Sequence, residues 1–259
     1  MTSTIGILGV GAIASAIVTG LCEGVDDPPP VVLSPRGAEA GERLARAYPG
    51  VEVGPDNQAV LDRADVVLVC LRRQDAGLLA DLSWRPDQTV VSAVTGLSAP
   101  DLAAAVAPAH RTARAVPMVA TAVRAWSTPL RPDLPEARTV FERTGGVLAV
   151  GSDEEFDAVA TGLGTVAPFF DYLGTVATFL TDHGMARPDA ERLLGQSFAQ
   201  VAAPLGQGDV DLGELLRGHA TPGGGNEQLA ILMREAGVPK ATRAALDEVF
   251  RRQTGGSYG

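Results

Sequence analysis

Cysteine and lysine are almost absent from this chain of 259 residues, which has two cysteines and one lysine, Lys240. Cys22 and Cys70 alone offer neither a disulfide framework nor a structural zinc site built from cysteines. Such low cysteine usage is typical of a reducing compartment, and we expect a cytoplasmic location. The segment before Ile5 carries no basic leader, so no signal peptide is expected.

Basic residues and long apolar runs are also few. There are 21 basic and 31 acidic side chains, which give a formal net charge of −10. This charge argues against binding to nucleic acid or to an anionic membrane surface. No uninterrupted apolar run reaches about 18 residues, so the sequence predicts no membrane span. The hydrophobic content of 46% is that of a globular protein.

The first part of the chain alternates short β-branched runs with helical, alanine-rich runs. This alternation predicts a parallel sheet covered on both faces, in a doubly wound α/β arrangement of the Rossmann type. The expected strands are Ile5–Leu8, Val31–Leu33, Val51–Val53, Asp65–Cys70, Thr89–Val94, Arg111–Val116 and Gly146–Val150.

The remaining part has apolar residues at helical spacing and no convincing strand. We therefore expect two domains, a nucleotide-binding domain over residues 1–152 and an all-helical domain over residues 153–259. The helical part has more aromatic residues than one short bundle needs, which favours a homodimer formed through this domain. These aromatic residues are Phe156, Phe169, Phe170, Tyr172 and Phe179.

A glycine motif of the form G-x-G-x-x-A follows the first expected strand. Gly9 would make the tight turn, and Gly11 would let a pyrophosphate approach the backbone. The amides of Ala12 and Ile13 would open a helix whose positive end suits phosphate, and Ala14 would allow the helix to pack closely on the strand. The motif predicts dinucleotide binding.

The end of the second expected strand indicates which dinucleotide is preferred. Sites for NAD usually place an acidic residue there for the ribose hydroxyls, and this sequence has none. Ser34 and Arg36 would instead hold a 2′-phosphate, so we expect NADPH to be preferred over NADH. Leu71, Arg72 and Thr95 follow later strands at the same sheet edge and would line the cofactor.

Candidate catalytic groups are scarce. The three histidines, His110, His183 and His219, are far apart in the sequence, and no metal site is predicted. The helical part contains no lysine other than Lys240 to act as a proton donor, which disfavours carbonyl reduction. Reduction of an imine is favoured, because a protonated C=N bond needs orientation and desolvation more than a strong acid.

Three consecutive glycines, Gly223 to Gly225, precede an expected helix at Asn226. Their amides and the helix N-terminus could bind a small carboxylate, and an ordinary linker between helices is the alternative.

These motifs together resemble the pyrroline-5-carboxylate reductase family. The glycine motif, the Ser34-Pro35-Arg36 strand end and the Asp56-Asn57 pair match the cofactor side of that family. The run from Ala64 to Gln74 is similar to its A-D-x-(V/I)-x-L-(A/x)-V-K-P-Q element. Thr221 to Asn226 is similar to its S-P-G-G-(T/A)-T element.

The resemblance implies a two-domain enzyme that reduces a cyclic imino acid to proline with NAD(P)H. It implies that Asn57 contacts the cofactor, that Gly224, Gly225 and Asn226 orient the substrate, and that Thr221 shapes their loop. It also implies dimers formed through the helical domain, which often build larger rings. Several elements differ from the family's pattern. Val116-Pro117-Met118 stands for its M-P-N, Arg72-Arg73-Gln74 for its K-P-Q, and Asn226 for its final Thr. The S-G-S-G-P-A helix start is matched only in part, by Thr161 to Gly164.

These differences keep two alternatives open. One is a reductase of another imine or ketone in specialised metabolism. The other is a non-catalytic nucleotide-binding protein that has kept the fold.

Overall fold

The computed structural model describes residues 3–206 and 210–255. The chain forms two compact units, one of residues up to Ala160 and from Phe250 onward, the other of Thr161–Val249. Two helices, α6 (Asp153–Leu163) and α11 (Val238–Thr254), run across the boundaries between the units. The expected division into residues 1–152 and 153–259 remains a prediction.

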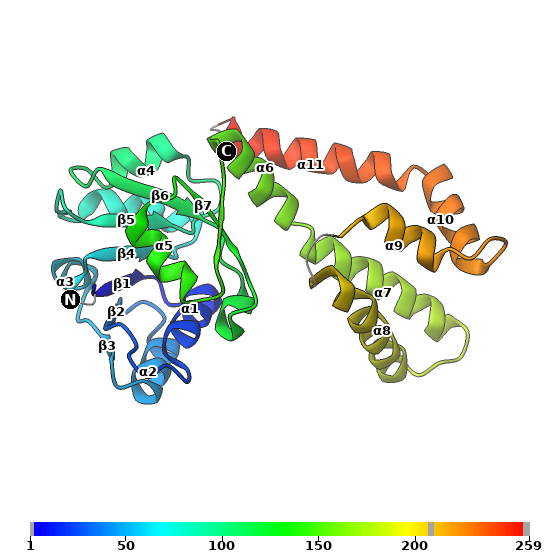
Figure 1. The fold of residues 1–259 in the computed structure, drawn as a ribbon, viewed down its shortest axis with the longest axis horizontal. Coiled ribbons are helices and arrows are strands. Elements are labelled where there is room, and N and C mark those ends of the chain that lie inside the picture. Colours follow the sequence, from blue (N-terminus) through cyan, green and yellow to red (C-terminus); the bar gives the residue numbers. More distant parts are fainter. Residues whose placement is uncertain (1–2, 207–209, 256–259) are drawn as a thin grey trace. The chain divides into compact units, whose positions relative to one another are not determined.

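The first unit is built on an eight-stranded sheet in the order β3-β2-β1-β4-β5-β6-β7-β8 (Figure 1). The strands are β1 (Ile5–Leu8), β2 (Val31–Leu33), β3 (Val51–Val53), β4 (Val66–Val69), β5 (Thr89–Ser92), β6 (Arg111–Ala115), β7 (Thr128–Arg131) and β8 (Val147–Ala149). The first six pair in parallel, with β1 between β2 and β4. This is the strand order of a doubly wound dinucleotide-binding sheet, so the expected fold class is confirmed.

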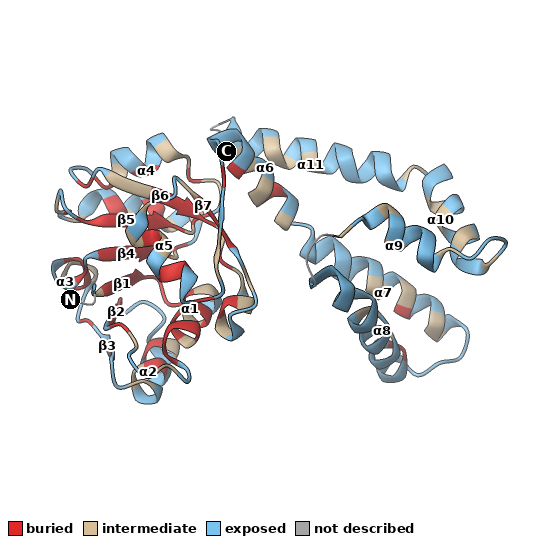
Figure 2. Cartoon of the chain, in the orientation of Figure 1, coloured by how far each residue is buried: buried red, intermediate tan, exposed pale blue. Residues whose placement is uncertain are grey.

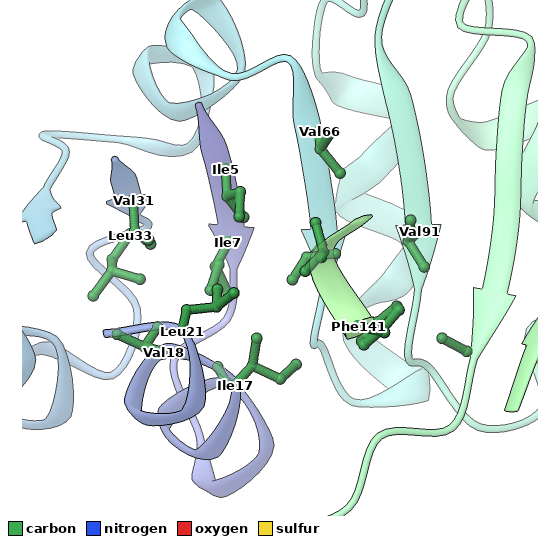
Figure 3. Close-up of a cluster of buried hydrophobic side chains, with 14 of the residues drawn as sticks. Ile5, Ile7, Ile17, Val18, Leu21, Val31, Leu33, Val66, Val91 and Phe141 are labelled. Atoms are coloured by element: carbon green, nitrogen blue, oxygen red, sulfur yellow. The ribbon is translucent and has the colours of Figure 1, made fainter. Parts of the chain in front are cut away.

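Side chains alternate between the two faces of the sheet, and each face has its own apolar core. Ile5 and Ile7 of β1 join one cluster with Phe141 (Figure 3), whereas Leu8 joins the other with Leu102. The helical segments of this unit are α1 (Ala12–Cys22), α2 (Ala38–Ala47), α3 (Asn57–Arg63), η1 (Arg73–Asp81), α4 (Ala99–Ala105), η2 (Val119–Val123) and α5 (Pro135–Glu142). Burial on both faces explains why the strands are continuous apolar runs.

One strand was missed by the sequence analysis. β7 has the sequence Thr-Pro-Leu-Arg and pairs antiparallel with β6. Its four residues include a proline and an arginine and show no β-branched run, so no strand pattern is visible. The pairing extends the sheet beyond its nucleotide-binding part, since β8 then pairs with β7.

The start of α6 is tied to the sheet through Arg114 of β6. The Arg114 guanidinium is 2.5 Å from Asp157 Oδ1 and 2.9 Å from Asp153 Oδ1. It also lies over the Phe156 ring, 4.4 Å from its centroid. Because the Arg114 side chain is only 6% exposed, these contacts fix the first two turns of α6 inside the first unit.

The second unit contains helices and no strand in its described residues. Its helical segments are α7 (Val166–Asp182), α8 (Arg187–Ala202), η3 (Ala203–Gly206), α9 (Leu212–His219) and α10 (Gly225–Glu235), with most of α11. These helices are largely exposed in the single chain, in contrast to the buried sheet (Figure 2). The aromatic rings on α7 and α8 contact one another through Phe169, Tyr172 and Phe198, yet Phe170 is 63% exposed.

One stretch of the described chain passes a test for membrane spans by length and composition alone. It is Asp153–Asp182, and 6% of its most apolar 18-residue window is buried. The stretch begins with Asp153, Glu154 and Glu155, and its first carboxylate pairs with Arg114. Apolar helices of soluble proteins pass the same test, so this finding is weak evidence for a membrane.

Candidate nucleotide and substrate site

The glycine motif forms a tight turn between β1 and α1. Gly9 has φ of +90°, and a Cβ at this position would lie 2.8 Å from the carbonyl oxygen of Cys70. Both observations require glycine. Ala14 is fully buried, as expected for a residue that lets α1 pack closely on the sheet.

The N-terminus of α1 is open to an anion. Gly11 is the N-cap residue, no side chain caps the helix, and no acidic residue lies in its first turn. A Cβ at Gly11 would meet no atom within 4 Å, and Ala12 is exposed while Ile13 is half-buried. Unpaired amides at the positive end of a helix favour phosphate, so this turn fits the pyrophosphate of a dinucleotide.

The loop after β2 is attached directly to the glycine turn. Ser34 is 1% exposed, and its Oγ accepts a hydrogen bond of 2.8 Å from the Gly9 N–H. The Val10 N–H donates to the Arg36 carbonyl over 3.1 Å, and Gly37 has φ of +90°. A Cβ on Gly37 would lie 2.2 Å from the Val10 carbonyl oxygen. The position of the Arg36 backbone relative to the glycine turn is therefore closely defined.

A carboxylate of η1 contacts the guanidinium groups of two predicted cofactor residues. Asp75 Oδ2 lies 2.7 Å from Arg36 Nη2 and 3.1 Å from Arg72 Nε. The hydrogen bond from Arg36 is the main cause that lowers the pKa of Asp75, and the bond from Arg72 contributes in the same direction. The sequence analysis missed Asp75, because only the spatial adjacency of β2 and β4 to β1 reveals this contact.

The remaining predicted cofactor residues follow the parallel strands or begin the helix after β3. Leu71 and Arg72 follow β4, and Thr95 follows β5, so the parallel register brings them to the edge that carries Gly9. Leu71 is buried, whereas Thr95 is exposed. Asn57 is the first residue of α3, which is capped by a hydrogen bond of 2.8 Å from Ala59 N–H to Asp56 Oδ1.

The predicted substrate loop lies in the second unit, between α9 and α10. The Gly224 N–H donates to the Thr221 carbonyl over 2.8 Å, which closes a turn with Gly223 at φ of +74°. Asn226 Nδ2 donates to the His219 carbonyl over 3.1 Å and so ties the loop to the end of α9. No side chain caps α10, whose first residue is Gly225.

One amide of this loop already contacts a carboxylate. The Gly223 N–H donates to Glu227 Oε2 over 2.7 Å, a contact that the sequence analysis did not identify. A glutamate in the first turn that reaches back to an amide before the helix is a common capping arrangement. The amide at Gly223 is therefore satisfied internally, and the open amides are those at the start of α10.

Neither histidines nor carboxylates assemble a metal site in residues 3–206 and 210–255, where no group of three or more His, Cys, Asp or Glu side chains could hold an ion. His183 and His219 each place Nδ1 within 2.9 Å of the carbonyl four residues earlier on their own helices. These two rings are engaged in helix-end contacts.

The comparisons with known proteins agree with this architecture. The profile of the family described as "NADP oxidoreductase coenzyme F420-dependent" matches residues 4–96. The pyrroline-5-carboxylate reductase of Corynebacterium melassecola is 26% identical over 251 residues, 91% of this chain and 92% of that protein. The pyrroline-5-carboxylate reductase of Synechocystis is 27% identical over 267 residues, 97% of each chain.

Solved structures share the fold along the whole chain. The 1-pyrroline-5-carboxylate reductase of Streptococcus pyogenes superposes with a TM-score of 0.81 at 21% identity, over 98% of both chains. A pyrroline carboxylate reductase of Plasmodium falciparum with NADP bound gives a TM-score of 0.76 at 12% identity, over 98% of this chain and 97% of that chain.

A doubly wound sheet with an open glycine turn, followed by a helical unit, is the architecture of a dinucleotide-dependent oxidoreductase. The matches along the chain confirm the resemblance that the motifs indicate. Over more than nine-tenths of its length the chain is similar to curated pyrroline-5-carboxylate reductases, at 26% and 27% identity.

Proposed function

We propose that this chain reduces pyrroline-5-carboxylate to proline and that it prefers NADPH as the reductant. The observation that carries the proposal is the open N-terminus of α1 behind Gly9 and Gly11, in a chain similar to curated pyrroline-5-carboxylate reductases over more than nine-tenths of its length. When bound, the reduced nicotinamide supplies the hydride that the imine carbon accepts.

In the first unit, the chain's residues bind and orient the dinucleotide cofactor. The amides of Gly11, Ala12 and Ile13 hold the pyrophosphate at the positive end of α1. Arg36 offers a guanidinium to the 2′-phosphate, and this contact is the basis for the proposed preference for NADPH. Asn57, Leu71, Arg72 and Thr95 line the rest of the cofactor, and Ser34 fixes the turn through Gly9.

On the substrate side, the loop of the second unit orients the imino acid. The open amides at Gly225 and Asn226 bind its carboxylate, with Gly224 and Thr221 shaping the turn. The protonated imine nitrogen already carries the positive charge that favours hydride addition, so orientation and exclusion of water are the main requirements. Asn226 offers its side-chain carbonyl to that nitrogen.

The second unit also supports a proposal about assembly. Phe170 and Phe179 on α7 are each at least 60% exposed in the single chain, and clusters of exposed apolar side chains mark association surfaces. We infer that two chains form a homodimer through this unit and that such dimers assemble into larger rings. We also infer that the protein is located in the cytoplasm. Light scattering at the mass of one chain would contradict the dimer.

The reductase is tested by following NADPH oxidation with pyrroline-5-carboxylate, with NADH in parallel, and by identifying proline as product. Turnover with NADPH at higher kcat/KM than with NADH is expected. Nucleotide binding without proline formation would contradict the substrate assignment. A panel of other cyclic imines would then separate a changed specificity from a non-catalytic relative.

A further inference from the structure

The cation expected to recognise the 2′-phosphate already has an anionic partner within the chain. Asp75 Oδ2 is 2.7 Å from Arg36 Nη2 and 3.1 Å from Arg72 Nε, so one oxygen serves two guanidinium groups. The Asp75 side chain is 19% exposed, against 45% for Arg36 and 71% for Arg72. The carboxylate is therefore the most enclosed member of this group of three.

The arrangement follows from the sheet topology. Arg36 comes after β2, and Asp75 lies in η1 after β4, the two strands that flank β1. The Arg36 carbonyl accepts a hydrogen bond from the Val10 N–H of the glycine turn, so the Arg36 backbone is held beside the nucleotide-binding edge. Asp75 thus places a negative charge next to the Arg36 guanidinium, the group that would bind the 2′-phosphate of the ribose.

We propose that Asp75 is a specificity-determining residue, whose carboxylate competes with the 2′-phosphate for Arg36 and so reduces the discrimination between NADPH and NADH. This inference rests on the nucleotide site of the proposed function. A 2′-phosphate and a carboxylate carry like charges, and like charges brought together disfavour binding. The unphosphorylated ribose has no charge at this position and meets no such repulsion.

The test is the binding of NADP⁺ and NAD⁺ by isothermal calorimetry to the wild-type chain and to Asp75→Asn. The asparagine keeps the side-chain shape and removes the charge. We expect the Kd for NADP⁺ to fall about tenfold at low salt, while the Kd for NAD⁺ changes less than about twofold. The difference should shrink as salt rises, because exposed charges are screened.

A matched control is available on the same segment. Asp81 is the last residue of η1, is exposed, and makes no ion pair with Arg36. Asp81→Asn changes the net charge by the same amount and should alter neither Kd.

The outcomes separate this inference from the proposed function. An unchanged or weaker affinity of Asp75→Asn for NADP⁺ would overturn the competition, as would an equal tightening of both nucleotides. A wild-type chain that binds NADP⁺ without forming proline would contradict the reaction alone. A wild-type chain that binds neither nucleotide would overturn both.

Discussion

The hydroxyl oxygen of Ser34 accepts a hydrogen bond of 2.8 Å from the backbone N–H of Gly9, and Ser34 is buried. A side chain at the end of β2 thus satisfies an amide of the glycine turn after β1. The expected phosphate contact of Ser34 remains a proposal, whereas its role in holding the turn is a property of the fold.

Replacing Ser34 by alanine should destabilise the sheet unit. A buried amide left without its partner costs roughly 1–3 kcal/mol, so the free energy of unfolding should fall by that amount. Urea denaturation monitored by circular dichroism measures this free energy of unfolding. Ser83→Ala, at an exposed position without a side-chain hydrogen bond among the described residues, should stay within about 0.5 kcal/mol of the wild type. Equal stability of both variants would contradict the proposed role.

Two glycines of the nucleotide edge should respond differently to alanine. Gly37→Ala introduces a side chain at φ of +90° and 2.2 Å from the Val10 carbonyl oxygen, which should cost roughly 3 kcal/mol or more in stability. Gly11→Ala has open space in the protein and should cost about 1 kcal/mol or less. Gly11→Ala should instead raise the Kd for NADPH at least about tenfold, because its methyl group occupies the approach of the pyrophosphate.

Thermal unfolding and fluorescence titration with NADPH distinguish the two glycine variants. Gly77→Ala, which also meets no atom within 4 Å, is the control for a glycine substitution away from the turn. The assignment of the pyrophosphate fails if Gly11→Ala binds NADPH as tightly as Gly77→Ala.

Arg114 should be one of the most sensitive charged positions. Its side chain is 6% exposed and pairs with Asp153 and Asp157, so truncation to alanine removes a buried cation from both carboxylates. Arg131 remains 3.8 Å from Asp153 Oδ1. Breaking a fully buried ion pair costs about 3–5 kcal/mol, but Asp153 is 55% exposed and Asp157 is 25% exposed, so water screens part of the loss. Chemical denaturation should show a loss of about 2–3 kcal/mol. Arg192→Ala removes an exposed pair with Asp189 and should cost less than about 1 kcal/mol. Comparable losses in the two variants would disprove the anchoring role.

Asn226 should affect substrate handling and not nucleotide binding. Asn226→Ala removes the side-chain carbonyl offered to the imine, so kcat/KM for pyrroline-5-carboxylate should fall by about two orders of magnitude. The Kd for NADPH should not change. Gln228→Ala, two residues further along the exposed start of α10, is the matched control. Turnover by Asn226→Ala at the wild-type rate would exclude this loop residue from the reaction.

The two thiols should be unreactive in the folded protein. Burial raises the pKa of Cys70 to about 12 and also raises that of Cys22, so at pH 8 both remain protonated, and the thiolate is the reacting form. A disulfide reagent should modify neither cysteine until denaturant is added. Modification of the native chain within minutes would show that the sheet opens around β4 or α1.

The parts of the site that the sequence predicted depend on residues close together in the chain. Gly9 and Gly11 act through local backbone geometry, and the spacing from Ile5 to Ala14 is enough to recognise the turn. The strands β1 and β4 are continuous apolar runs for a similar reason, since both their faces are buried.

The features that the sequence did not predict depend on which strands become neighbours in the sheet. Arg36 and Asp75 are 39 residues apart and meet because β2 and β4 flank β1. Arg114 and Asp157 are 43 residues apart, and their ion pair requires α6 to pack beside β6. β7 has a composition close to that of a turn and is a strand only because β6 and β8 pair with it.

The helical unit is an insertion in the covalent sense, because the chain enters it through α6 and leaves it through α11. A single peptide-bond cleavage at the turn around Gly184 would therefore divide the helical unit and would not detach it from the sheet unit as one piece. The amino-terminal fragment would keep the glycine turn and Arg114, and the carboxyl-terminal fragment would keep Asn226 together with the chain end from Phe250 that belongs to the sheet unit. Each fragment would still carry part of the sheet unit, so two separately expressed fragments test whether this unit reassembles without a continuous chain.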